Sequence, residues 1–162
     1  MSLEALSALS VFAFVSSITP GPNNLMLLAS GMNFGFRATI PHMLGISLGF
    51  FVMELAVGMG IAEAFERFPA VYTLLKWAGG AYLLYLAWRI ANAGVVRAGD
   101  KTTAAGKPLS FFGAAAFQWV NPKAWAMAVS AFSIYVPPPL SWMLVVGVSA
   151  LFAIINLPCV SS

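Results

Sequence analysis

The sequence predicts an all-α membrane protein, a bundle of helices that crosses a lipid bilayer several times. Three observations predict this class: 60% of the 162 residues are hydrophobic, only 8% are charged, and the mean hydropathy is +0.88. Soluble domains are about one quarter charged. Because a helix needs about 20 apolar residues to cross the hydrocarbon core, the chain has room for about five spans in one domain, residues 1–162.

The composition also argues against several other classes of protein. Cys159 and His42 are the single residues of their kind, so the chain has no disulfide framework and no cysteine or histidine cluster for a metal. It has no HExxH pair or phosphate-binding loop. The net charge of +3 comes from scattered basic residues, unlike a nucleic-acid interface. We therefore expect no enzyme, no cofactor, no metal and no nucleic-acid partner.

The first predicted span, residues 3–32, is interrupted by two prolines that flank a glycine. Proline removes a backbone donor and clashes with the preceding turn. In hydrocarbon, the freed backbone groups cost several kcal/mol unless protein or a wet cavity takes them up. The interruption therefore predicts a lined cavity, and a simple kink capped by neighbouring helices is the alternative. The residues that we expect to bind a polar solute here are Pro20, Gly21, Pro22, Asn23 and Asn24.

The next two spans set the expected orientation in the membrane. The second span is predicted over residues 39–62, after a short loop that ends at Arg37, with Pro41 in its first turn. The third covers residues 70–90. Residues 94–109 form the longest polar stretch, which has a basic excess. The positive-inside rule places this loop in the cytoplasm and the N-terminus outside.

The fourth span, residues 110–136, is predicted to be interrupted as well, at Asn121 and Pro122. Lys123 follows directly, near the middle of the span. It either binds a substrate carboxylate or extends its ammonium group away from the hydrocarbon with no role in binding. The fifth span begins near residue 140 and carries Asn156. We expect Asn121, Pro122, Lys123 and Asn156 to belong to the same substrate site.

The two interrupted spans indicate an internal repeat. The alignment pairs Pro22 with Pro122, Pro41 with Pro139, and Gly49 with Gly147. A three-helix unit in residues 1–93 and a partial copy in residues 110–162 would be inverted relative to each other, as in many secondary transporters. This 3+3 arrangement predicts a sixth helix after residue 162, so that the chain is C-terminally truncated. Interrupted helices at matching positions are the best indication of a binding site.

Two charged side chains fall inside predicted spans. Glu54 in the second span and Lys76 in the third would lie at similar depth in the membrane. They form either a structural ion pair or, because burial favours a protonated carboxyl, a proton-coupling site at Glu54. His42, near the cytoplasmic end of the second span, is expected to be a hydrogen-bonded interfacial residue rather than a proton relay.

Together these motifs resemble the LysE/RhtB family of bacterial amino acid exporters. Many family members have an acid after the Pro-Gly-Pro, and the Asn-Asn form found here is more similar to the cysteine and O-acetylserine exporter branch. The motifs that carry the resemblance are Thr19-Pro20-Gly21-Pro22-Asn23-Asn24, Gly35-Phe36-Arg37-Ala38, Leu44-Gly45, Gly79-Gly80-Ala81-Tyr82-Leu83, Asn121-Pro122-Lys123 and Asn156-Leu157-Pro158.

The resemblance implies a six-span protein of the bacterial inner membrane that exports small neutral amino acids or their derivatives. Cysteine, O-acetylserine, homoserine and threonine are of this type. It also implies coupling to the proton gradient, with Glu54 as the candidate residue. Two alternatives stay open: efflux of another small solute or cation, and a membrane scaffold or inactive remnant that does not transport. A homo-oligomer is compatible with both.

Overall fold

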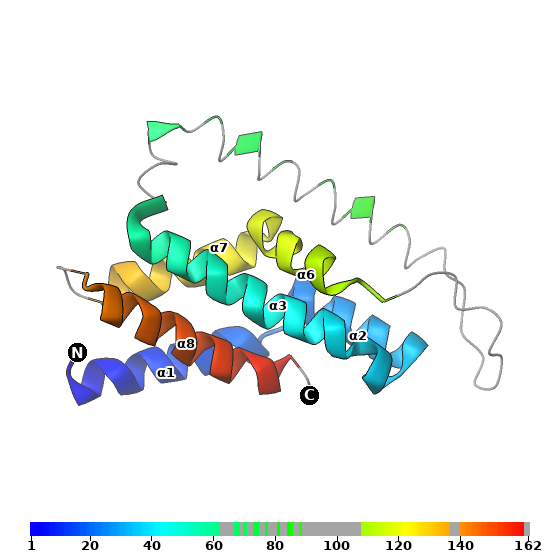
Figure 1. Ribbon diagram of the computed structural model, residues 1–162, viewed down its shortest axis with the longest axis horizontal. Coiled ribbons are helices and arrows are strands. Elements are labelled where there is room, and N and C mark those ends of the chain that lie inside the picture. Colours follow the sequence, from blue (N-terminus) through cyan, green and yellow to red (C-terminus); the bar gives the residue numbers. More distant parts are fainter. Residues whose placement is uncertain are drawn as a thin grey trace.

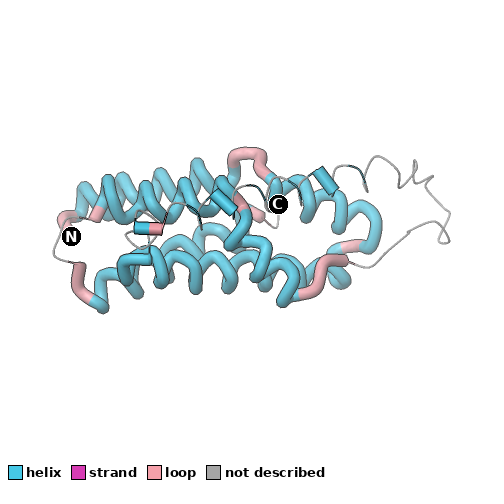
Figure 2. Tube along the Cα trace, turned by 90° about the horizontal axis from the view of Figure 1, so that it is seen from above, coloured by secondary structure: helices cyan, strands magenta, loops and turns pink. Residues whose placement is uncertain are grey.

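A computed structural model describes residues 1–61, 67–68, 70, 73–74, 77, 81, 84–85, 88, 108–136 and 140–160. In these residues, all regular structure is helical, and the longer helices run along an elongated bundle (Figures 1 and 2). Most of the predicted third span, the polar loop up to residue 107, Lys76 and Pro139 lie outside the described residues.

The first predicted span consists of two helices, α1 (Leu3–Ile18) and α2 (Pro22–Phe34), that meet at an angle of 51°. α1 begins after Ser2, whose Oγ accepts a hydrogen bond from the backbone N–H of Ala5 at 3.2 Å. It ends at Ile18, directly before Thr19 and Pro20. α2 begins with Pro22, which suits a first helical position because its missing N–H would have no intrahelical partner there. The predicted interruption is confirmed.

The second predicted span begins earlier than expected. Only Gly35 separates α2 from α3 (Phe36–Ala56), which continues as a π-helix, η1 (Val57–Ile61). Gly35 has a φ of 81°, a conformation that glycine adopts without steric cost, so the chain changes direction at one residue. The expected loop ending at Arg37 is therefore wrong, because Arg37 lies in the first turn of α3. Pro41 lies in the interior of α3 rather than in its first turn.

The fourth predicted span is a series of short helices: α6 (Phe111–Phe117), the 3₁₀ turn η2 (Gln118–Val120), α7 (Pro122–Ser130) and the π-helix η3 (Ala131–Tyr135). Asn121 stands between η2 and α7 with an extended backbone. The predicted interruption near Asn121 and Pro122 is confirmed. The fifth predicted span is α8 (Trp142–Cys159), which contains Pro158 in its last turn.

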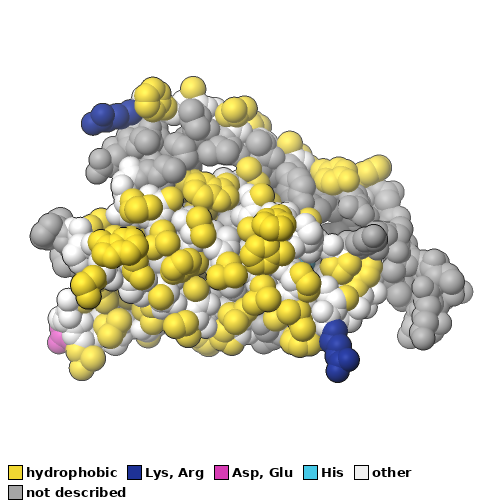
Figure 3. All heavy atoms as spheres, in the orientation of Figure 1, with side chains coloured by type: hydrophobic (Ala, Val, Ile, Leu, Met, Phe, Trp, Pro, Cys, Tyr) yellow, Lys and Arg dark blue, Asp and Glu magenta, His cyan; other side chains and the backbone are white. Residues whose placement is uncertain are grey.

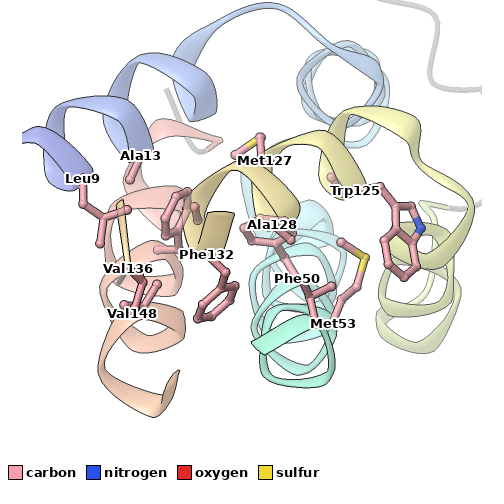
Figure 4. Close-up of a cluster of buried hydrophobic side chains, with 14 of the residues drawn as sticks. Leu9, Ala13, Phe50, Met53, Trp125, Met127, Ala128, Phe132, Val136 and Val148 are labelled. Atoms are coloured by element: carbon pink, nitrogen blue, oxygen red, sulfur yellow. The ribbon is translucent and has the colours of Figure 1, made fainter. Parts of the chain in front are cut away.

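α3 lies at the centre of the bundle and packs mainly against α6 and α8. Its backbone lies very close to α6, because a Cβ at Gly45 would be 2.3 Å from the Phe111 carbonyl oxygen and one at Gly49 would be 2.5 Å from the Ala115 Cα. Small residues permit such close packing of membrane helices. On its other side, side chains from α1, α3, α7, η3 and α8 converge in one buried apolar cluster (Figure 4).

Large apolar side chains also cover the outside of the bundle, as Figure 3 shows for one face. By length and composition, α3 with part of η1 (Phe36–Gly60) and α8 are suited to cross a membrane, and the bent pair α1–α2 adds a third span. The structure therefore supports a membrane helix bundle, while the five-span count and the inverted 3+3 repeat stay predictions. The aligned glycines differ, since a Cβ at Gly147 would have no neighbour within 4 Å.

Candidate functional site

The two interruptions lie side by side and line a small, partly open cavity. The cavity has about 20 Å³ of free space, which is room for a single water molecule. Its walls come from α1, α2, α3, α7, the residue before α7, and the C-terminal end of α8. The residues that line it are Ser16, Ser17, Asn23, Asn24, Phe50, Asn121, Lys123, Ala124, Met127, Asn156 and Val160.

Two helices begin at this cavity. α2 begins after Gly21, which has no side chain to accept a hydrogen bond from the first turn. α7 begins after Asn121, whose Oδ1 accepts a hydrogen bond from the backbone N–H of Lys123 at 3.1 Å. The first turn of a helix has N–H groups without intrahelical partners and carries a partial positive charge. Asn121 already caps one amide of α7, so the uncapped start of α2 favours an anionic group in the cavity more than that of α7 does.

Lys123 joins the second interruption to the first. Its Nζ donates a hydrogen bond to the Thr19 carbonyl oxygen, which lies at the end of α1. Its side chain passes over Gly21, where an added Cβ would be 2.6 Å from the Lys123 Cδ. The ammonium group thus points to the other interruption, where it donates to a carbonyl group that has no intrahelical partner.

A pair of carboxamides forms a second connection. Asn23 Nδ2 donates to Gln118 Oε1 at 2.9 Å, and Gln118 Nε2 donates back to Asn23 Oδ1 at 3.2 Å. Gln118 is completely buried, and its Nε2 also donates to the Ala114 carbonyl oxygen at 3.0 Å. This third bond fixes which way the Gln118 amide faces. The sequence analysis missed Gln118, although a carboxamide in the apolar segment 111–120 was the available signal.

The other asparagines have different roles. Asn24 Nδ2 donates to the Ser17 carbonyl oxygen at 3.1 Å and lies 3.5 Å from those of Ile18 and Thr19, so Asn24 caps the end of α1. Asn156 of α8 donates from Nδ2 to Ser17 Oγ at 3.3 Å. Its Oδ1 is buried without a hydrogen-bond partner. Asn156 therefore supplies the cavity with an acceptor that is still available.

The structure brings together Asn23, Asn24, Asn121, Lys123 and Asn156, which all line the cavity. The other residues predicted for the substrate site, Pro20, Gly21, Pro22 and Pro122, shape the two interruptions but are not among its lining residues.

The two buried titratable residues of α3 are not among the lining residues either. Glu54 is fully buried, and neither carboxyl oxygen has a hydrogen-bond partner. His42 is 2% exposed, and neither ring nitrogen has one. The expectation of a hydrogen-bonded interfacial His42 is therefore wrong, because α3 begins at Phe36 and places His42 inside the bundle. Among the residues that the structure describes, no three His, Cys, Asp or Glu side chains gather to hold a metal.

Comparison with known proteins agrees with the motifs. The LysE type translocator family model matches residues 14–159. A cysteine/O-acetylserine efflux protein of Escherichia coli O1:K1 / APEC is 42% identical to the chain, and those of Escherichia coli strain K12 and Shigella sonnei strain Ss046 are 41% identical. Each comparison covers 96% of this chain and 78% of the relative. No solved structure matches. The resemblance found in the motifs is thereby confirmed: the chain belongs to the LysE type translocator family and is a membrane transport protein, not an enzyme.

Proposed function

We propose that the protein exports small neutral amino acids or their derivatives across the bacterial inner membrane, with cysteine and O-acetylserine as the first candidates. Family membership supports export, and relatives that share 41–42% of its residues are named for efflux of these two compounds. The proposed orientation has the N-terminus outside and residues 94–109 in the cytoplasm, on the positive-inside rule.

One observation carries the proposal: a cation, two helix starts and an unpartnered acceptor meet at one cavity. The substrate carboxylate binds Lys123 Nζ and the first-turn amides of α2 and α7, since charge-assisted hydrogen bonds and helix N-termini both favour an anion. The substrate ammonium donates to Asn156 Oδ1. A bound zwitterion would therefore satisfy a buried acceptor that is costly to leave without a partner.

The apolar part of the wall suits a small neutral side chain. Phe50, Ala124 and Met127 face the cavity, and among the described lining residues Lys123 is the single charged one. A second positive charge on the substrate would have no anionic partner in this wall. This arrangement favours a substrate whose only cationic group is its ammonium.

Transport requires the cavity to enlarge, because an amino acid needs several times the space of one water. The Lys123–Thr19 and Asn23–Gln118 hydrogen bonds hold the two interruptions together. In the proposed cycle the substrate carboxylate replaces the Thr19 carbonyl on Lys123, and the interrupted helices separate. One repeat then rocks against the other to open the site alternately to each side of the membrane.

We also propose Glu54 as the proton-coupling residue. A carboxylate buried without a partner is strongly disfavoured, so the Glu54 environment favours the protonated acid. Any movement that admitted water would favour release of the proton. Such a group can take up a proton in one conformation and release it in the other.

Export from cells fed with dipeptides tests the proposal. Cells that express the protein should accumulate less of the transported amino acid inside and more outside, across a panel of neutral, acidic and basic residues. Lys123→Met should strongly reduce the difference, and Gly147→Ala, at a position with open space around it, should retain it. A panel without any difference, at normal protein levels in the membrane, would contradict export and favour the scaffold alternative.

A further inference from the structure

The interface between α3 and α8 contains a second polar layer, one helical turn away from the cavity. The two helices run antiparallel, and two contacts, one in α3 and one in its continuation η1, fix their register. A Cβ at Gly58 would be 2.6 Å from Val145 Cγ1, and the rings of Phe50 and Phe152 have their centroids 5.9 Å apart. At the other end of the interface, Met43 of α3 shares a buried cluster with Val160.

This register places Glu54 at the level of Val148 and Ser149, because Glu54 lies midway between Gly58 and Phe50, and these two residues lie at the middle of Val145–Phe152; Ser149 is the polar one. The Glu54 and Ser149 side chains are fully buried, and neither has a hydrogen-bond partner. By the same register, Ser47 lies opposite Asn156, which lines the cavity. Polar residues thus occupy two layers of the interface, two helical turns apart.

The Phe50 and Phe152 rings lie between these two layers. Both are almost completely buried, at 2% and 0% exposure, and Phe50 also lines the cavity. Glu54 follows Phe50 by four residues, which is about 6 Å along a helix. The carboxyl group of Glu54 is therefore close to the cavity but separated from it by an aromatic layer.

We propose that Ser149 is the hydrogen-bond partner of Glu54 during transport, so that the two side chains together form a proton-binding site apart from the substrate cavity. The proposal rests on the proposed export function and on coupling at Glu54. A serine hydroxyl can rotate and act as donor or acceptor. The protonated carboxyl donates its O–H to Ser149 Oγ. After the proton leaves for water, the Ser149 O–H donates to the carboxylate.

Among the residues that the structure describes, the other titratable groups near α3 are placed as follows. Lys123 of α7 lines the cavity, and Cys159 of α8 lies beyond Asn156, so both are on the cavity side of the rings. Tyr135 of η3 stacks on Phe12 of α1 with ring centroids 5.2 Å apart. Arg37 and His42 lie on α3 itself, more than two turns before Glu54. In the described part of the chain, Ser149 is thus the polar side chain that the register places opposite Glu54.

The test uses the full chain in liposomes, with labelled cysteine kept reduced and an imposed pH gradient. Transport is measured over a range of pH for the wild type, Ser149→Ala and Ser149→Thr. Hydrogen bonds to a charged group are stronger than those to a neutral one, so loss of the hydroxyl disfavours the carboxylate most. We expect Ser149→Ala to move the midpoint of the pH profile upward by about one unit and Ser149→Thr to restore it.

Ser47→Ala is the matched control, because Ser47 is a buried serine of the same interface on the other side of the rings. It should leave the midpoint unchanged. If Ser149→Ala fails to reach the membrane, Ser149→Cys replaces it, and its weaker donor should shift the midpoint in the same direction.

The outcomes separate this inference from the functions on which it rests. If Ser149→Ala keeps the wild-type midpoint while Glu54→Gln loses its pH dependence, Ser149 has no role in proton binding. Coupling at Glu54 would then still stand. A wild-type pH profile in Glu54→Gln overturns both, while export itself stands. Absence of transport by the wild type across the cysteine, O-acetylserine and threonine series overturns the proposed function.

Discussion

Polar groups at the two helix interruptions have hydrogen-bond partners, whereas two buried polar side chains in the α3–α8 interface have none. At the interruptions, side chains bind across the gap: Lys123 to the Thr19 carbonyl, Asn23 to Gln118, and Asn24 to the end of α1. In the α3–α8 interface, Glu54 and Ser149 have no hydrogen-bond partners. The interruptions are therefore joined by hydrogen bonds, whereas the interface contains buried polar groups without partners.

The prolines show the same contrast. Pro20 and Pro22 flank Gly21 and separate two helices, but Pro41 and Pro158 lie inside continuous ones. A proline alone does not end a helix here. At the interruption, the Thr19 carbonyl accepts a hydrogen bond from Lys123. Gly21 has no Cβ, which leaves room for the Lys123 side chain. A break inside a membrane is stable only when the freed backbone groups have new partners.

The largest expected effect comes from filling the close contact between the continuous helices. Gly49→Leu places atoms on the backbone of α6, since even a Cβ would be 2.5 Å from the Ala115 Cα. Overpacking against backbone should destabilise the protein by about 3 kcal/mol or more. Thermal unfolding in detergent measures this loss. Gly147→Leu, with open space around it, is the control, and equal melting temperatures for the two variants would contradict the close packing.

Removing the charge that joins the interruptions should have the next largest effect. Lys123→Met keeps the length of the side chain but removes the donor to Thr19 and, in the proposed function, to the substrate carboxylate. Bonds of charged groups contribute about 1.5–3 kcal/mol, so kcat/KM for transport should fall about 10- to 100-fold. Assays in liposomes measure it. Lys123→Arg, which keeps the charge, should retain more activity, and wild-type transport by Lys123→Met would exclude Lys123 from binding.

A smaller effect is expected for the carboxamide pair. Gln118→Leu leaves Asn23 without its partner, and the loss of about 1 kcal/mol should lower kcat/KM about fivefold. Because Gln118 holds Asn23 and does not line the cavity, the change should affect KM through Asn23. A double-mutant cycle with Asn23→Ala checks this, since residues in contact give non-additive effects. Fully additive effects would show that the two side chains act independently.

The smallest effect is expected at the proline that does not interrupt its helix. Pro41→Ala restores a backbone donor inside α3 and should leave export within about twofold of the wild type. Stability should stay equal or rise, because alanine is the better helix former. The melting temperature measures the stability, and the export rate measures transport. A large loss of export would show that Pro41 is needed for transport, although α3 is continuous through it.

Residue patterns were sufficient to locate the interruptions but not all of their partners. Two prolines around Gly21, and Pro122 after Asn121, have strong local backbone effects that any fold must accommodate. Gln118 escaped prediction because a lone carboxamide has no local signature, and its role comes from Asn23, far away in the chain. The prediction of a loop at residues 33–37 was wrong, because Gly35 alone is enough to make the turn between α2 and α3.

The sequence by itself determined the membrane class, the two interruptions and the family, because hydropathy, proline and short motifs act locally. Only the tertiary structure decided which polar groups have partners. Lys123 meets Thr19, and Glu54 lies opposite Ser149, because helices distant in the chain pack in one particular register. That register depends on packing along whole helices, such as the close approaches of neighbouring residues to Gly49 and Gly58, which no short stretch of sequence contains.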